Sequence, residues 1–284
     1  MRSRTWSRSL GDCNPFSGDF DDQIMLQSPD YVASFAVYIT LGSISMPTQF
    51  FSVVPSKAWL LLTAGPVLFL LSIVGVSIFF SFREVPVAQI PERVTALAPH
   101  ILLGVLVCLA VLMARFVPEV KAAWLLPDPS KAFSDITIGL LAGVLLAISY
   151  IYWLAPLLEI LQRTFGDFVP PGSVLPTVSS SIGLFFIANV LLAPLVEETL
   201  YRGIAIPLLT THLGLLWAVV LTCVFFGLLH WAGGFWYMLL TGVVAGGAFA
   251  GLFCWRGSVL APFVAHLALN IIEFIYAWHK HNQA

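Results

Sequence analysis

Apolar residues gather along the chain into long blocks that are separated by polar or proline-bearing connectors. The blocks lie at residues 31–53, 58–80, 97–117, 136–161, 180–208, 213–230, 234–255 and 258–278. Their length of about 20 residues is what an α-helix needs to cross the hydrocarbon core of a bilayer. Because lipid offers the backbone no hydrogen-bond partners, each block must satisfy its own backbone groups as a helix. The pattern predicts an all-α polytopic membrane protein with about eight transmembrane helices.

The connectors divide the chain into three parts. They are long and polar between the early blocks and become very short after Ser180. We therefore expect the last four helices to form one bundle over 179–280, preceded by four N-terminal helices over 31–178. Residues 1–30 lack the apolar stretch of a cleaved signal peptide, and we expect them to form an extramembrane arm.

Composition agrees with this class of protein. Hydrophobic residues make up 59% of the chain and charged residues 10%, whereas soluble domains carry about 25% charged residues. The lipid bilayer is therefore the expected surrounding. The net charge of -2 gives no sign of the basic surface that a nucleic-acid partner requires. The four cysteines contain no CxxC pair, so they indicate neither a metal site nor a disulfide framework.

Ionisable and strongly polar side chains lie deep in the apolar blocks of the C-terminal half. An ionisable side chain at the centre of a membrane helix costs about 2.5–3.5 kcal/mol on the insertion scale. Such residues usually have a partner and mark a functional site. The fifth block contains Glu197, Glu198 and Arg202, the sixth ends at His230, and the eighth contains His266, Asn270 and Glu273.

Helical spacing predicts which of these groups pair within one helix. Glu198 and Arg202 are four residues apart with the acid first, which is the better order for an ion pair on one helix face. Glu197 is rotated by about 100° from Glu198 in an α-helix, so Arg202 leaves it unpaired. His266 and Asn270 are also four residues apart and are expected to share one face.

The groups without a local partner suit hydrolysis if the short connectors bring their helices together. A carboxylate, Glu197, can take a proton from water, and a histidine, His230, can share that task or protonate a leaving amine. His266 and Asn270 can donate hydrogen bonds to an oxyanion. No serine or cysteine stands out as a nucleophile. The alternative is structural, a polar lock that joins the helices without catalysis.

Three motifs, in this order and each in its own block, resemble those of the CPBP family of CAAX-type membrane endopeptidases and Abi-type immunity proteins. The family pattern is EExxxR, FxxxH and HxxxN, which stand here at Glu197–Arg202, Phe226–His230 and His266–Asn270. The resemblance covers roughly residues 180–275. It implies that Glu197 and His230 activate water, that His266 and Asn270 hold the oxyanion, and that Glu198 and Arg202 support the site.

The resemblance also implies an activity and a location. We expect an intramembrane endopeptidase that hydrolyses a peptide bond of a membrane-associated protein or peptide, in the inner membrane of a prokaryotic cell. One alternative is a CAAX prenyl-protein endopeptidase, and another is a non-catalytic immunity or adaptor protein.

No cofactor is expected for this reaction. HExxH is absent from the sequence, and a glutamate-activated water needs no metal ion. Zinc bound by Glu197, His230 and His266 remains the alternative, since two histidines and one glutamate form a known catalytic zinc site.

Overall fold

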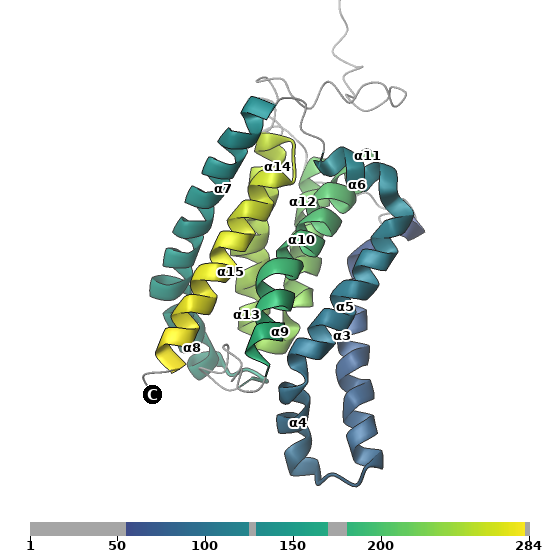
Figure 1. The fold of residues 1–284 in the computed structure, drawn as a ribbon, viewed down its shortest axis with the longest axis vertical. Coiled ribbons are helices and arrows are strands. Elements are labelled where there is room, and N and C mark those ends of the chain that lie inside the picture. Colours follow the sequence, from purple (N-terminus) through teal and green to yellow (C-terminus); the bar gives the residue numbers. More distant parts are fainter. Residues whose placement is uncertain (1–54, 125–128, 170–180, 282–284) are drawn as a thin grey trace, which may run out of the picture. The chain divides into compact units, whose positions relative to one another are not determined.

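The computed structural model describes residues 55–124, 129–169 and 181–281, and every structural statement below concerns these residues. They are almost entirely helical and contain no β-strand (Figure 1). Six helical segments are long and apolar enough to cross a membrane. The expected all-α polytopic membrane fold is therefore confirmed. The expected arm at 1–30 and the expected first span, 31–53, lie outside the described residues.

The described helices correspond to the other expected spans, with bounds that run past the apolar blocks. In chain order they are α3 (Ser56–Phe82), α4 (Ile90–Ala96), α5 (Ala98–Met113), α6 (Val117–Trp124), α7 (Pro129–Ser149), α8 (Ala155–Phe165), α9 (Ile182–Phe185), α10 (Ala193–Glu197), α11 (Ile206–Leu213), α12 (Leu215–Leu229), α13 (Phe235–Leu240), α14 (Gly247–Arg256) and α15 (Leu260–His281). Several of these join end to end, so that Ser130–Phe165 and Ile182–Leu213 are each one continuous segment. At 15 residues, α12 is shorter than a full span, and the number eight is only approximate.

Four π-helical stretches interrupt these segments, so the assumption of continuous α-helices is wrong there. They are η4 (Tyr150–Leu154), η5 (Phe186–Leu192), η6 (Glu198–Ala205) and η8 (Thr241–Gly246). In a π-helix each N–H bonds to the carbonyl five residues earlier, and such stretches are frequent at functional sites. The stretch η6 carries most of the EExxxR motif.

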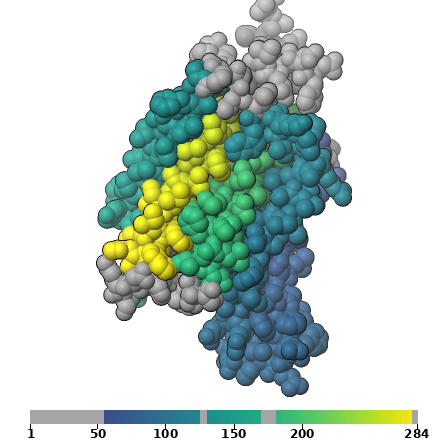
Figure 2. Space-filling view, in the orientation of Figure 1, coloured from purple at the N-terminus to yellow at the C-terminus, as the bar shows by residue number. Residues whose placement is uncertain are grey.

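Helices α7 and α15 run side by side (Figure 1). Glycines permit this close approach: a Cβ atom on Gly139 would lie 2.6 Å from the carbonyl oxygen of Ala261, and one on Gly143 would lie 2.8 Å from Cβ of Ala268. Small residues spaced by four are the usual means by which membrane helices pack backbone to backbone. On the face drawn in Figure 2, α15 lies between α7 and the green segment that contains α9 and α10.

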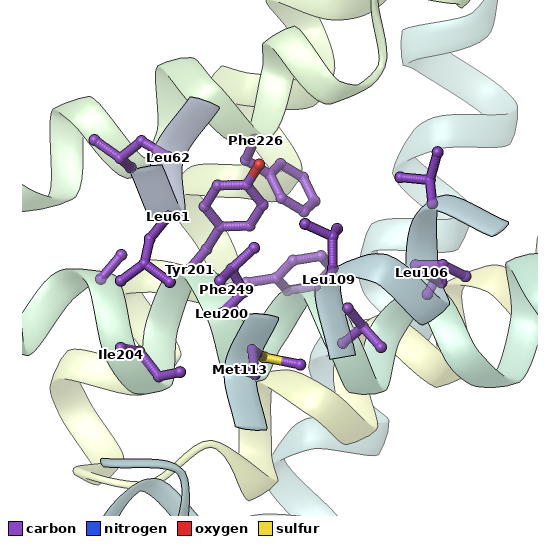
Figure 3. Close-up of a cluster of buried hydrophobic side chains, with 14 of the residues drawn as sticks. Leu61, Leu62, Leu106, Leu109, Met113, Leu200, Tyr201, Ile204, Phe226 and Phe249 are labelled. Atoms are coloured by element: carbon purple, nitrogen blue, oxygen red, sulfur yellow. The ribbon is translucent and has the colours of Figure 1, made fainter. Parts of the chain in front are cut away.

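A buried hydrophobic cluster holds η6 against the helices around it (Figure 3). From η6 it includes Leu200, Tyr201 and Ile204, which pack with leucines of α3 and α5, with Phe226 of α12 and with Phe249 of α14. Large apolar side chains are meanwhile exposed along α3 and α7, as expected of lipid-facing surfaces. The cluster therefore encloses the segment that carries the motif acids.

An ion pair joins the start of α7 to the connection between α14 and α15. Asp135 is fully buried and binds Nε of Arg256, while its other oxygen accepts a hydrogen bond from Ser258 Oγ at 2.8 Å. The sequence places Asp135 at the very edge of its apolar block, where a charged side chain looks like part of a connector.

Candidate active site

Glu198 connects two of the three motifs. Its Oε1 accepts a hydrogen bond from Nη1 of Arg202 at 3.1 Å, so the ion pair expected from the spacing is present. The same oxygen lies 2.8 Å from Nδ1 of His266 on α15, a contact that the sequence did not predict. Arg202 in turn donates from Nη2 to the carbonyl oxygen of Gly246 at 3.0 Å. All three side chains are buried, and within the described residues Glu198 Oε2 and Arg202 Nε have no hydrogen-bond partner.

Aromatic rings enclose this unit. The guanidinium of Arg202 lies 4.3 Å from the ring centre of Phe226 and 5.5 Å from that of Phe249. His266 stacks on Phe249 with ring centres 4.7 Å apart and meets Phe226 edge-on at 5.9 Å. Phe226, the first residue of the FxxxH motif, thus packs against the arginine of one motif and the histidine of another.

His230 follows directly after the last residue of α12 and bends back onto that helix. Its Nδ1 lies 2.8 Å from the carbonyl oxygen of Phe226. Because a carbonyl oxygen only accepts hydrogen bonds, Nδ1 must carry the proton, which leaves Nε2 of a neutral ring with a free lone pair. Tyr237 packs against the ring with centres 6.1 Å apart. His230 is therefore held in the tautomer that a general base requires.

Asn270 lies one turn after His266 on α15. Its side-chain Nδ2 donates a hydrogen bond at 2.8 Å to the backbone carbonyl oxygen of Asn189, in η5. An amide nitrogen carries two hydrogens, so one remains for another acceptor. Sequence reasoning missed this partner because a backbone carbonyl has no signal in the residue pattern.

One cavity brings His230, His266 and Asn270 together. Its other polar lining residues are Tyr150, Tyr237, Thr241 and Glu273, and the remaining lining residues are mainly apolar or aromatic, among them Leu146 and Leu158. Its volume of about 50 Å³, measured for the centres of water-sized spheres, is enough for a few water molecules. Residues 146–158 belong to the segment of α7 and α8, so the lining draws on both sides of the boundary expected near 178.

Glu197, the other acid of the EExxxR motif, is not among the residues that line this cavity. It is the last residue of α10 and is only 3% exposed. Its Oε2 is buried and has no hydrogen-bond partner within the described part of the chain. A buried polar atom without a partner is uncommon in native proteins and calls for an explanation, such as a catalytic role.

Asp167, in the connector after α8, holds the turn that follows His230. Its Oδ1 accepts a hydrogen bond from the backbone N–H of Phe235 at 2.8 Å, and its Oδ2 accepts one from that of Trp236 at 3.3 Å. Burial opposes ionisation of Asp167, but these hydrogen bonds and others from Gln162 and Phe168 together lower its pKa. Between His230 and α13, Gly234 has a φ of 105° and faces this carboxylate. The turn therefore requires both a glycine and the acid.

The zinc alternative requires three ligand side chains that lie close to one another. Among the residues with a described position, no three His, Cys, Asp or Glu side chains are grouped so that they could hold a metal ion. The Nδ1 atoms of His230 and His266 are engaged by Phe226 and Glu198 respectively.

Comparison with known families identifies the C-terminal part of the chain. Residues 179–272 match the family model described as Type II CAAX prenyl endopeptidase Rce1-like. The resemblance to the CAAX protease family is thereby confirmed. The match includes every motif residue from Glu197 to Asn270 and ends before Glu273. The chain has six apolar helices and is an integral membrane protein, and its residues 179–272 are similar to CAAX-type endopeptidases. Comparisons with curated proteins and with solved structures returned no match.

Proposed function

We propose that this protein is an intramembrane endopeptidase that uses water activated by Glu197 and His230 to hydrolyse a peptide bond of a membrane-associated protein or peptide. The observation that carries the proposal is that His230, with its free Nε2, lines the same cavity as His266 and Asn270. A base and two hydrogen-bond donors around a water-sized space are what water attack on a carbonyl needs.

In the proposed reaction His230 Nε2 accepts a proton from water as the oxygen attacks the scissile carbonyl carbon. Glu197 is proposed to supply the carboxylate, and its unpartnered Oε2 is available to orient the water or to take up the proton. Collapse of the tetrahedral intermediate breaks the C–N bond, and the proton passes to the departing amine. Glu197 is buried and His230 is partly buried, so bulk water competes little for these proton transfers.

His266 and Asn270 are proposed to stabilise the oxyanion. Asn270 retains one N–H after its bond to Asn189. With its Nδ1 engaged by Glu198, a His266 ring that carries both protons donates from Nε2 to the oxyanion. Losing one such donor typically lowers a rate by about 10²–10³.

A CAAX prenyl-protein endopeptidase is the second candidate, because the matching family model carries that description. The two candidates differ in substrate and not in the proposed chemistry. A prenylated peptide and its unprenylated counterpart, assayed in parallel, distinguish them. We place the protein in the inner membrane of a prokaryotic cell.

The test uses purified protein reconstituted in lipid vesicles with a set of membrane-anchored peptides, with and without a prenyl group. Products are identified by mass spectrometry for the wild type and for Glu197→Gln. Cleavage by the wild type that is lost in a folded Glu197→Gln variant supports the proposal. Equal products from both contradict the role of Glu197, whereas binding of the peptides without any cleavage favours the non-catalytic adaptor.

A further inference from the structure

Glu273 is an acid in the cavity to which the proposed reaction gives no role. It lies on α15, seven residues after His266 and three after Asn270, and all three line the same cavity. Two helical turns place it about 10 Å along the helix axis from His266. Within the described residues, no other side chain forms a hydrogen bond or an ion pair with it. An acid inside a membrane span without a protein partner marks a site for something that enters from outside.

Two tyrosines line the same cavity as this acid. They are Tyr150 of η4 and Tyr237 of α13. Tyr237 also packs against His230 with ring centres 6.1 Å apart, so it connects the two ends of the cavity. A carboxylate together with aromatic rings is a typical environment for a cation, which gains from the charge and from the ring faces.

The cavity lacks a cation of its own to balance Glu273. Neither Lys nor Arg is among its lining residues within the described part of the chain. Arg202, the buried arginine nearby in the bundle, is already engaged by Glu198 and by the Gly246 carbonyl. A cation that pairs with Glu273 therefore comes from a bound molecule and not from a lysine or arginine of the lining.

We propose that Glu273, with Tyr150 and Tyr237, forms a subsite that accepts a primary ammonium group of the substrate. An extended peptide advances about 3.3–3.6 Å per residue, so this group sits about three residues from a scissile bond held at His266. The group comes either from a lysine side chain or from a free N-terminus. This inference rests on the proposed function for the position of the scissile bond, whereas the binding of the cation does not depend on catalysis.

Binding is measured first, in the Glu197→Gln background so that no peptide is consumed. The probes are acyl-anchored hydrophobic peptides of one sequence in lipid nanodiscs, in which each of six positions in turn is Lys or the neutral, similarly long Met. A further pair has a free or an acetylated N-terminus. The variants are Glu273→Gln, Glu273→Leu as an apolar replacement that suits a membrane helix, and Glu92→Gln as a control on an exposed acid of α4.

The expected result is that Lys binds about tenfold tighter than Met at one position, or that the free amine binds about tenfold tighter than the acetylated peptide. Either preference should disappear in both Glu273 variants and persist in Glu92→Gln. The two peptide pairs distinguish a lysine from an N-terminus as the source of the ammonium group. No preference for any cationic peptide overturns the proposal, as does a preference that survives in a folded Glu273 variant.

Cleavage by protein that retains Glu197 is then measured with the same peptides. If the subsite serves the proposed reaction, kcat/KM is higher for the preferred cationic peptide than for the matched neutral peptide. In Glu273→Gln the two kcat/KM values become equal. Cation binding without any cleavage contradicts the proposed function and leaves the subsite intact. Cleavage that ignores the cation in every variant contradicts the subsite and leaves the proposed function intact.

Discussion

Glu198 and His266 are 68 positions apart in the chain, yet Oε1 of the first lies 2.8 Å from Nδ1 of the second. The contact sets which ring nitrogen of His266 is engaged and leaves Nε2 for the cavity. Glu198 therefore does more than neutralise Arg202, because it also orients a histidine of the proposed oxyanion site. This double role separates it from its neighbour Glu197, for which no such contact exists in the described structure.

Replacing the two motif acids should have different consequences. Glu198→Ala removes the partner of a buried arginine, which typically costs about 3–5 kcal/mol, so the yield of folded protein should fall. Glu197→Gln removes only an ionisable group without an ion-pair partner, and this variant should fold normally and be inactive. Monodisperse yield by size-exclusion chromatography, together with peptide cleavage, measures both. High activity in Glu197→Gln alongside inactive but well-folded Glu198→Gln would reverse the two roles.

Asn270→Ala should lower kcat by about 10²–10³ if its remaining N–H donates to the oxyanion. The matched control is Asn189→Ala, because Asn270 binds the backbone carbonyl of Asn189 and not its side chain. This control should retain the hydrogen bond and nearly all activity. A similar loss in the two variants, with folding intact, would mean that the Asn270 amide acts through local structure and not on the substrate.

The metal question is decided by elemental analysis of active protein and by activity after exhaustive chelation. Water activated by Glu197 and His230 predicts full activity in metal-free protein. The zinc alternative predicts stoichiometric metal, activity that is lost on chelation and restored by zinc, and loss of metal content in His266→Ala. The results predicted for zinc would contradict the mechanism in which Glu197 and His230 activate water.

Asp167 should make stability depend on pH in a defined window. Its pKa in the folded protein is below the ordinary value of 3.8, so folding favours the carboxylate over the protonated acid. The resulting stabilisation is complete above that ordinary value and is lost as the pH falls through the folded pKa. Loss of a helix-capping side chain typically costs about 0.5–2 kcal/mol.

Thermal unfolding in detergent measures this effect for Asp167→Ala from pH 3 to pH 7. The difference from wild type should be largest above pH 4 and shrink below it. The control is Glu159→Gln, which removes an exposed acid paired with Arg163 on α8 and should change stability by less than about 1 kcal/mol at any pH. A constant difference for Asp167→Ala across the range would show that its charge is not what supports the turn after His230.

The sequence predicted the membrane helices, which depend on the bilayer, and the ion pair within one helix, which depends on residue spacing. Blocks of apolar residues indicate where the helices lie, because in lipid each segment must form its backbone hydrogen bonds within itself. The pair Glu198–Arg202 follows from a spacing of four residues, and it survives in η6 although that stretch is a π-helix. The three motifs can be recognised without knowing how their helices pack, and the family match at 179–272 agrees with them.

Contacts between helices were beyond the residue pattern. The bond from Glu198 to His266 depends on how α15 packs, and that of Asn270 ends on a backbone carbonyl. Asp135 looked like a connector residue because it stands at the end of an apolar block, whereas it is fully buried against Arg256. Tyr150 has no motif around it, and only the packing of its segment places it in the cavity.

Because α7 packs closely on α15, the cavity is lined both by the motif residues and by residues outside the motifs. The motif residues all fall inside 179–272, whereas Tyr150 precedes that range and Glu273 follows it. A substitution in η4 can therefore alter what fits in the cavity while every proposed catalytic side chain stays in place. Proteins that share these motifs and differ at the positions of Tyr150 and Glu273 should keep one chemistry and accept different peptides.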